Sequence, residues 1–362
     1  RQGCRVQTLP HRYRCALSPC HWLTLMDDER SVHSLPSYRG SMRTCWVIDH
    51  PAHFQLFRQW FRDDDILVVT ERQELDAMLT DGFVQPTLRV PRVQGSFLQK
   101  VSLGRRRQKA VRSFLKSNPV SRIISKGAPF ELRAAKGLVA ERWYLTDTEV
   151  NTVAHKLAKP THVLLPESWD GSLKATHTYP GILPQAYVPP NTDAWESAKG
   201  QVQKEIGLSE EDLVVFHRKL LGDGIHDGVE IVNYEQSIRK MEVHFVENKE
   251  SAAATDGSAW DLPVQATLFD GVLTGSTTLA AEAVIQGVPT LLISKAKRGF
   301  LTYLSDQPHF FHWNEDDLFD GRFTEMANEW MNMMRKSRTT GRTAVVDETR
   351  ATLNELFGQP VA

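Results

Sequence analysis

From Met42 onward, short runs of β-branched and other apolar residues alternate with stretches in which apolar residues recur at helical spacing. This alternation is typical of a parallel β-sheet covered by helices. In residues 52–61, for example, Phe54, Phe57 and Phe61 share one face of a helix. The apolar runs that predict strands in this half of the chain are 44–48, 66–70, 87–90, 122–125, 142–145 and 162–165. We therefore expect one doubly wound α/β domain here.

The alternation pauses at residues 179–191, where four prolines exclude a helix and predict an extended connection. Strand patterns then resume at 213–216, 242–246, 271–273 and 290–293, and they predict a second α/β domain. The last helical patterns, 316–336 and 345–357, have no strand after them, and we expect one of them to pack back on the first domain. Two facing domains would bring together the strand ends at which parallel sheets bind ligands.

The length of 362 residues suits two domains of ordinary size. We place the first domain at residues 42–188, the second at 189–340, and a C-terminal helix that packs on the first domain at 341–362. Residues 1–41 lack a periodic apolar pattern, and we expect them to be a disordered or non-native leader, with Met42 as the native start. No apolar run approaches the roughly 18 to 20 residues that cross a bilayer.

Three of the four cysteines, Cys4, Cys15 and Cys20, lie in this leader, and Cys45 lies in a predicted strand. The body of the protein thus has no disulfide framework, which favours a reducing, cytoplasmic setting. His21 and the three leader cysteines could be drawn as zinc ligands, but they lack two closely spaced ligand pairs, and we expect no metal. Basic and acidic residues nearly cancel, at 43 and 44, so net charge indicates no nucleic-acid partner.

The stretch FDGVLTGSTTLAAEAVIQGVP, residues 269–289, is the most informative about function, because it predicts a strand, a polar turn and a helix. Gly275 permits a sharp turn, and Ser276, Thr277 and Thr278 place hydroxyls and backbone N–H groups at the helix start. Such a start attracts a phosphate through its unpaired N–H groups and the positive end of the helix dipole.

Glu282, one turn into the same helix, could accept a hydrogen bond from a sugar hydroxyl. After the strand at 213–216, Arg218 and Lys219 emerge beside a glycine-rich turn that contains His226, and we expect these residues to help bind a nucleotide diphosphate. The alternatives are an ordinary helix start that Ser or Thr caps for stability, and surface solvation for each cation.

In the first domain, the first strand runs into DHPAH, residues 49–53, whose proline suits the opening turn of a helix. His53 at this carboxyl edge is a candidate general base, because a histidine pKa lies near neutral pH. Asp147 and Glu149 follow the strand at 142–145 and could orient a sugar hydroxyl or act as acid or base. The alternatives are capping or packing for His53, N-capping for Asp147, and a helix-dipole interaction for Glu149.

No acidic residue occurs between Asp81 and Glu131. The basic residues in that interval are Arg89, Arg92, Lys100, Arg105, Arg106, Arg107, Lys109, Arg112, Lys116, Arg122 and Lys126. We expect residues 89–126 to meet an anionic membrane surface, peripherally on its inner face, or a lipid-phosphate acceptor. RNA is the second choice, because no RNA-binding motif accompanies the charge. A solvated helix face is the alternative, although such faces usually mix charge signs.

Several of these motifs, taken in order, resemble a known family. They are VIDHPAHF at 47–54, YLTDTE at 144–149, YPG at 179–181 with AY at 186–187, and the stretch from Gly275 to Pro289. They resemble a largely archaeal family of unknown function that is similar in turn to the non-hydrolysing UDP-N-acetylglucosamine 2-epimerases and to GT-B glycosyltransferases. The resemblance covers essentially residues 42–357. It implies a GT-B-like α/β fold of two Rossmann-like, doubly wound parallel-sheet domains that face each other across a cleft.

The resemblance also implies roles for residues of the closing motif. The equivalents of Ser276, Thr277 and Thr278 lie against the nucleotide diphosphate in the epimerases, and the equivalent of Glu282 holds the ribose. This chain has Thr-Thr where the epimerases have Gly-Gly, and Ser-Lys-Gly at 125–127 where they have an acidic turn. Without that carboxylate, an elimination and readdition mechanism loses one acid/base group.

Three functions follow as hypotheses. The first is a GT-B glycosyltransferase whose substrate is a nucleotide-sugar, expected to be UDP-linked, with His53 as general base and with no cofactor or metal. The second is a UDP-N-acetylglucosamine 2-epimerase in which Asp147, Glu149 and either His217 or His226 move protons. The third is a protein that binds a nucleotide-sugar without catalysis.

Overall fold

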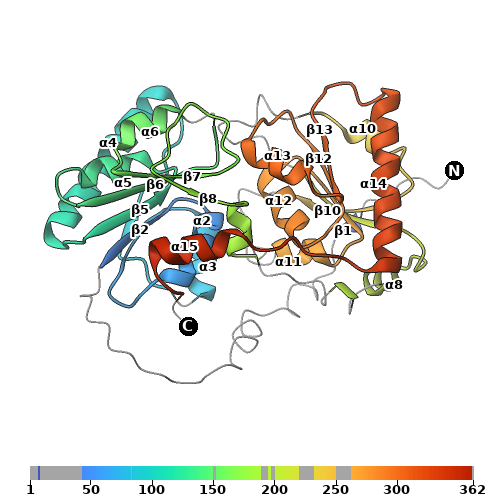
Figure 1. Cartoon of the computed structure of the whole chain (residues 1–362), viewed down its shortest axis with the longest axis horizontal. Coiled ribbons are helices and arrows are strands. Elements are labelled where there is room, and N and C mark those ends of the chain that lie inside the picture. The colour runs from blue at the N-terminus through green and yellow to red at the C-terminus, as the bar shows by residue number, and fades with distance from the viewer. Residues whose placement is uncertain are drawn as a thin grey trace, which may run out of the picture. The chain divides into compact units, whose positions relative to one another are not determined.

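The computed structural model describes residues 7–8, 43–82, 84–149, 152–188, 195–196, 200–219, 232–249 and 262–360. They form two compact units, each built on a parallel sheet (Figure 1). The N-terminal unit contains residues 43–179 and 352–360, and the C-terminal unit contains residues 7–8 and the described part of 180–351. The division between Tyr179 and Pro180 falls earlier than the predicted boundary after residue 188. Apart from Gln7 and Thr8, the predicted leader lies outside the described residues.

The sheet of the N-terminal unit has seven parallel strands in the order β4-β3-β2-β5-β6-β7-β8. The strands are β2 Thr44–Ile48, β3 Ile66–Thr70, β4 Leu88–Val90, β5 Arg122–Lys126, β6 Glu141–Leu145, β7 His162–Pro166 and β8 His177–Tyr179. The connecting helices are α2 Pro51–Phe57, the 3-10 helix η2 Arg58–Trp60, α3 Gln73–Asp81, α4 Phe97–Ser117, α5 Pro129–Ala135 and α6 Thr152–Ala158. The strand order reverses between β2 and β5, which is where open parallel sheets bind ligands.

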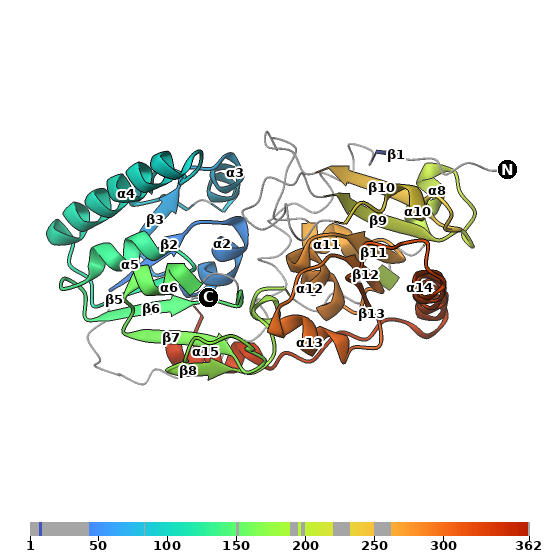
Figure 2. The same cartoon turned by 90° about the horizontal axis from the view of Figure 1, so that it is seen from above.

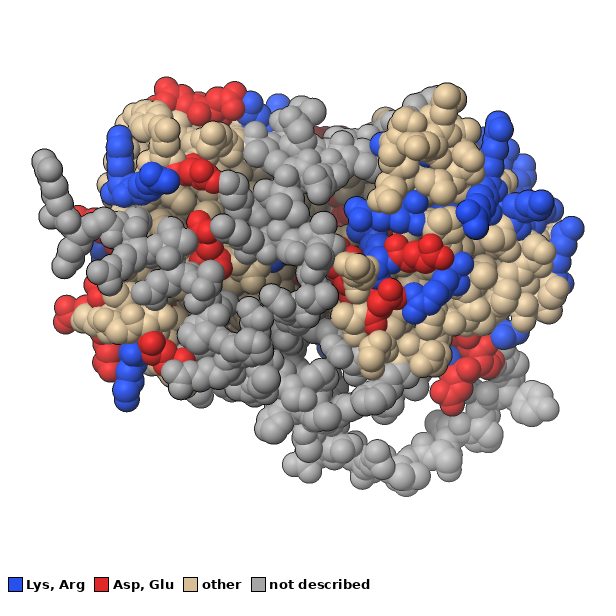
Figure 3. Space-filling view, turned by 180° about the vertical axis from the view of Figure 1, so that it is seen from behind, with Lys and Arg blue, Asp and Glu red and all other residues tan. Residues whose placement is uncertain are grey.

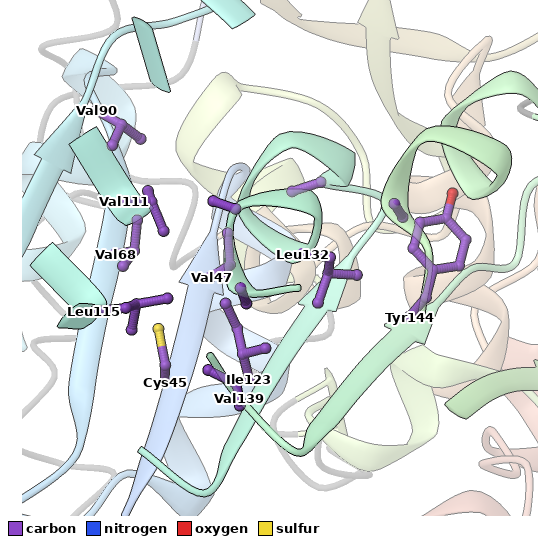
Figure 4. Close-up of a cluster of buried hydrophobic side chains, with 14 of the residues drawn as sticks. Cys45, Val47, Val68, Val90, Val111, Leu115, Ile123, Leu132, Val139 and Tyr144 are labelled. Atoms are coloured by element: carbon purple, nitrogen blue, oxygen red, sulfur yellow. The ribbon is translucent and has the colours of Figure 1, made fainter. Parts of the chain in front are cut away.

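Helices cover both faces of this sheet, because successive side chains of a strand point to opposite sides. Cys45 and Val47 of β2 belong to a buried cluster with Val111 of α4 and Leu132 of α5 (Figure 4). Trp46, between them in sequence, packs instead against the ring of Phe57 on α2, with ring centroids 5.3 Å apart. The apolar strand and the apolar helix faces together therefore account for the doubly wound arrangement.

The last helix, α15 Thr349–Phe357, contributes residues 352–357 to the N-terminal unit. Trp60 Nε1 donates to Asn354 Oδ1 at 3.1 Å, and Phe357 meets the ring of Trp46 edge-on. Buried Arg122 donates from Nη2 to the carbonyl oxygen of Phe357 at 2.8 Å and from Nη1 to that of Leu356 at 3.3 Å. The carbonyl groups at a helix end have no intrahelical partners, so this arginine both satisfies them and complements the helix dipole.

The sheet of the C-terminal unit has six parallel strands in the order β1-β10-β9-β11-β12-β13 (Figure 2). The strands are β1 Gln7–Thr8, β9 Val214–Lys219, β10 His244–Lys249, β11 Gly271–Thr274, β12 Thr290–Ile293 and β13 Phe310–Trp313. The helices are η3 Leu183–Ala186, α8 Gln201–Ile206, α10 Glu235–Ile238, α11 Leu262–Thr267, α12 Thr277–Ile285, α13 Gly299–Ser305 and α14 Gly321–Thr340. One buried cluster packs Trp330 and Met334 of α14 on the sheet, and another contains α12 and α13.

The structure confirms the predicted class of two parallel-sheet α/β domains. It adds three strands that the sequence patterns missed: β1, which lies in the predicted leader, β8 and β13. All three are edge strands that pair on one side only, and β8 and β13 are partly exposed, so neither of these two carries a continuous apolar run.

Two helix predictions were wrong in detail. The prolines of 179–191 do not exclude every helix, because η3 forms around Pro184. A single helical turn tolerates proline near its start, where the backbone N–H would have no partner. Helix α14 begins at Gly321 rather than at residue 316, because the side chain of Asp320 accepts from the N–H of Arg322 at 2.7 Å and caps the helix there.

Candidate functional site

The turn between β11 and α12 places a helix start at the carboxyl edge of the C-terminal sheet. Ser276 is the N-cap of α12, and its Oγ accepts from the N–H of Leu279 at 3.3 Å. The N–H of Ser276 itself donates to Thr274 Oγ1 at 3.0 Å. Ser276 therefore caps the helix. Within the described part of the chain, the N–H groups of Thr277 and Thr278 have no acceptor, which makes them the donors free for an anion.

Glycine has a different role in this motif from the one predicted. Gly275 does not adopt a positive φ, so the turn does not use the backbone freedom of glycine there. Gly287, just after the helix, has φ 76°, and a Cβ at this position would lie 2.6 Å from the carbonyl oxygen of Thr343. The positive φ and the close approach of another segment both require glycine at the end of the helix.

Arg218 lies on β9 next to this turn. β9 runs to Lys219, so the expectation that Arg218 and Lys219 emerge after the strand was wrong. Arg218 is the register partner of Thr274 on β11, and its carbonyl oxygen accepts from Thr274 Oγ1 at 3.2 Å. Its guanidinium donates to Asn248 Oδ1. The structure thus brings Arg218 near the start of α12, while the Lys219 side chain and His226 lie outside the described residues.

Glu282 is buried inside α12, with 5% of its surface exposed. Its Oε1 accepts from the hydroxyl of Tyr187 at 2.7 Å. Tyr187 follows η3 in the proline-rich segment, and sequence reasoning gave it no site role. A pairing across 95 residues leaves no local signal, which is why the sequence patterns did not indicate it.

His53 lies in the first turn of α2, at the carboxyl edge of the N-terminal sheet. His50 caps this helix, because its Nδ1 accepts from the N–H of Ala52 at 3.2 Å. Nδ1 of His53 is buried and has no hydrogen-bond partner in the described part of the chain. Burial and the nearby positive charges of Lys126 and Arg72 hold the pKa of His53 well below its usual value. The imidazole is therefore neutral near pH 7 and able to accept a proton.

Asp147 follows β6 but does not cap a helix, because α6 begins at Thr152. Its Oδ2 pairs with Nζ of Lys126, at the end of β5, at 2.8 Å. Burial and the negative charges of Asp147 and Glu149 raise the pKa of Tyr179, so both carboxylates lie near that hydroxyl. The structure therefore places Lys126, Asp147, Glu149 and Tyr179 at the carboxyl ends of β5, β6 and β8, with β7 between the last two strands.

Comparison with known proteins gave no match to any protein-family model and none among curated proteins. Solved structures do match. A Listeria monocytogenes protein with the provisional name UDP-N-acetylglucosamine 2-epimerase has a TM-score of 0.58 and 10% identity, with 90% of this chain and 99% of that one covered. The UDP-GlcNAc 2-epimerase of Neisseria meningitidis, bound to UDP-GlcNAc, has a TM-score of 0.51 and 10% identity over 87% and 98%. The glycotransferase of kitacinnamycin has a TM-score of 0.50 and 10% identity over 88% and 99%.

The chain has a GT-B-like fold. In both of its sheets the strand order reverses at one place, between β2 and β5 and between β9 and β11. His53 and Lys126 lie at the first reversal, and Arg218 and Ser276 lie at the second. Each group of candidate residues thus occupies the position at which such sheets bind ligands.

A charge network that the sequence interpretation missed joins Asp49, which lies between β2 and α2, to two buried side chains. Arg107 of α4, 3% exposed, donates from Nε to Oε1 of Glu131 at 2.6 Å and from both terminal nitrogens to Oδ1 of Asp49 at 3.2 Å. Its Nη2 also donates to Thr70 Oγ1 at 3.1 Å. The network holds Asp49, at the end of β2, in one position next to α2.

The basic stretch at residues 89–126 therefore lies only partly on the protein surface. Arg107 and Arg122 are buried and paired, Arg89 pairs with Asp76, and Arg112 donates to the carbonyl oxygen of Ala134. The exposed cations on the side of α4 that faces away from the sheet are Arg105, Arg106, Lys109 and Lys116, which we call the α4 basic face. Lys100 is also exposed but lies on the other side of the helix. Among the described residues none of these cations forms an ion pair. The face of the N-terminal unit seen in Figure 3 carries many Lys and Arg side chains.

None of the described helices is long and apolar enough to span a membrane. Within the same residues, no group of three or more His, Cys, Asp or Glu side chains could hold a metal ion. Cys4, Cys15, Cys20 and His21, the weighed zinc ligands, lie outside the described part of the chain.

Proposed function

We propose that this protein is a nucleotide-sugar-dependent glycosyltransferase of GT-B type whose C-terminal unit binds the nucleotide diphosphate at the start of α12. The observation that supports this most directly is the pair of unpaired N–H groups on Thr277 and Thr278, at a helix start that Ser276 caps. Arg218 adds a positive charge beside it. Glu282, held by Tyr187, would accept from a ribose hydroxyl one turn further along the helix.

In the proposed reaction, an acceptor hydroxyl attacks the anomeric carbon of the sugar while the bond from that carbon to the diphosphate oxygen breaks. His53, neutral at pH 7, takes the proton of the attacking hydroxyl, and Asp147 and Glu149 orient hydroxyl groups. The leaving diphosphate keeps the electron pair of the broken bond. The N–H groups at the start of α12 and the guanidinium of Arg218 stabilise its charge, so this chemistry needs no metal.

For the acceptor side, we propose that the α4 basic face meets an anionic membrane surface. Each Lys or Arg near such a surface contributes roughly 1 kcal/mol, so its four cations would give peripheral binding that depends on salt. Leu98, near the start of α4, is 77% exposed and would add an apolar contact. The acceptor would then be a membrane-associated or lipid-phosphate molecule.

The test of the donor site is Thr277→Pro compared with Thr277→Ala. Proline removes the backbone N–H but fits the first position of a helix, and Ser276 already has the extended backbone that precedes proline, with φ −84° and ψ 116°. We expect proline to weaken UDP binding in calorimetry by about 10-fold to 100-fold. Alanine keeps the N–H and should bind UDP as the unaltered protein does. Equal affinity in both variants would refute the assignment.

The epimerase remains a second candidate, because a UDP-GlcNAc 2-epimerase shares the fold. Two observations oppose it. Asp147 is already paired with Lys126, which occupies the position where the epimerases have an acidic turn. His217, one proposed proton carrier, is 2% exposed and bonded to the hydroxyl of Tyr234 at 3.1 Å. Incubation with UDP-N-acetylglucosamine alone decides between the two enzymes, since only an epimerase forms the manno isomer without an acceptor.

A further inference from the structure

Two arginines and a lysine lie at the same carboxyl edge of the N-terminal sheet as His53. Strands β4, β3, β2 and β5 are neighbours in that order. Arg92 follows β4, Arg72 follows β3, His53 follows β2, and Lys126 ends β5. Because adjacent strands lie about 4.8 Å apart, these residues occupy one short stretch of the sheet edge.

Arg72 differs from the paired arginines of this unit. It precedes α3 as the N-cap residue, yet its side chain makes no capping bond, and its buried Nε has no hydrogen-bond partner in the described part of the chain. Arg92 is exposed and has no ion pair or hydrogen bond with any described residue. A buried N–H without an acceptor is unfavourable, so the absence of an acceptor at Arg72 is a feature that needs a cause.

The two arginines are close to each other and to the site. Burial lowers the pKa of Arg72, with Asp49 opposing the shift and Arg92 reinforcing it. Asp49 is already bound by Arg107 and Thr70, and Asp147 by Lys126. The negative charge of Glu74, in the first turn of α3, opposes the lowering of the Arg72 pKa, but the two side chains form no ion pair. The carboxylates at this edge therefore do not neutralise Arg72 and Arg92 by direct contact.

We propose that Arg72 and Arg92 bind a phosphate group of the acceptor, which places the acceptor hydroxyl beside His53. A guanidinium presents N–H groups in a planar fork that matches the oxygens of a phosphate. The assignment rests on the proposed glycosyltransferase, for which it names the acceptor class: a molecule carrying a phosphate monoester or diphosphate. The α4 basic face would meet the surrounding membrane, whereas this pair would bind the acceptor itself.

The test is calorimetric titration of the full chain with inorganic pyrophosphate, with and without saturating UDP. UDP should abolish the binding event at α12 and leave a second one. Arg72→Ala and Arg92→Ala should each weaken that second event about tenfold, the loss of one charged contact. Arg72→Lys should weaken it less, because the charge remains. Arg89→Ala, which removes the arginine paired with Asp76 on the same side of the sheet, is the matched control and should change nothing.

Thermal unfolding checks the fold of each variant, and Arg72→Ala should unfold at an unchanged temperature, since its side chain bonds to no described residue. Unchanged pyrophosphate affinity in Arg72→Ala and Arg92→Ala, with UDP present, overturns the proposal. If UDP fails to bind but the Arg72-sensitive event persists, the proposed donor site fails and this site stands. Flotation with phosphatidic acid vesicles, compared with phosphatidylcholine vesicles, identifies which molecule carries the phosphate. Flotation that Arg72→Ala weakens indicates a lipid phosphate. If pyrophosphate binds but the protein does not float with phosphatidic acid, the acceptor is a soluble phosphate.

Discussion

Replacing Arg107 with methionine should destabilise the N-terminal unit strongly. Arg107 is 3% exposed, and its partner Glu131 is 0% exposed, so neither charge can turn to water when the other is removed. Breaking a buried ion pair by removing one partner costs about 3–5 kcal/mol. Arg107→Met keeps most of the side-chain volume, so the loss should come mainly from the uncompensated carboxylate and from Asp49 and Thr70, which lose a donor.

The loss should depend on pH. Burial raises the pKa of Glu131 above its ordinary value of 4.5, and the positive charge of Arg107 opposes that shift. Without Arg107 the pKa of Glu131 in the folded protein rises further. Glu131 then binds a proton more tightly in the folded protein than in the unfolded chain. The stability of the folded protein falls as pH rises from the unfolded pKa through the folded one. Urea unfolding of Arg107→Met should therefore show a smaller loss at about pH 5 than at about pH 8.

The control is the double variant Arg107→Met with Glu131→Leu, which removes both charges. Replacing a whole buried pair by apolar residues is often close to neutral, so the double variant should be clearly more stable than Arg107→Met alone. A loss below about 1 kcal/mol in Arg107→Met, or an equal loss at both pH values, would show that Glu131 is not held as a buried charge by Arg107.

Three further changes test the site and the fold. His53→Ala should lower the rate of sugar transfer by about 100-fold to 10,000-fold without changing UDP affinity, and an unchanged rate would remove His53 as the base. Because burial holds the pKa of His53 well below its usual value, the unaltered protein should keep its transfer activity as pH falls to the usual histidine pKa and lose it only at lower pH. Tyr187→Phe removes the hydroxyl that donates to Glu282, so it should weaken UDP binding several-fold and leave pyrophosphate binding unchanged. Equal weakening of both ligands would contradict the proposal that Glu282 binds the ribose. Arg122→Met should lower the free energy of unfolding in urea by about 2 kcal/mol, because the carbonyl oxygen of Phe357 loses a charged donor; no change would mean that this contact does not stabilise α15.

The sequence by itself determined the α/β class and most strands, because the helical spacing of apolar residues and the continuous apolar runs of strands are local properties of the chain. Strands β2, β3 and β12 have the predicted bounds. The start of α12 was predictable for the same reason: Ser276 caps the helix through the N–H of Leu279, which is only three residues away in sequence. The edge strands β8 and β13 were not predictable in this way, because a strand with one partner and one exposed side has no continuous apolar run.

What only the tertiary structure decided is which charged residues are paired. In sequence, Arg107 and Arg122 belong to the same basic stretch as Arg105, yet they are buried against Glu131 and the end of α15. The same is true of Asp147, for which the sequence suggested either an acid/base or sugar-orienting role or a helix cap, and which the structure pairs with Lys126. A cation's surroundings depend on residues distant in sequence that packing brings within 3 Å, and no local pattern records them. For that reason, the contact of Tyr187 with Glu282 and the lack of a partner for Arg72 Nε among the described residues became visible only in three dimensions.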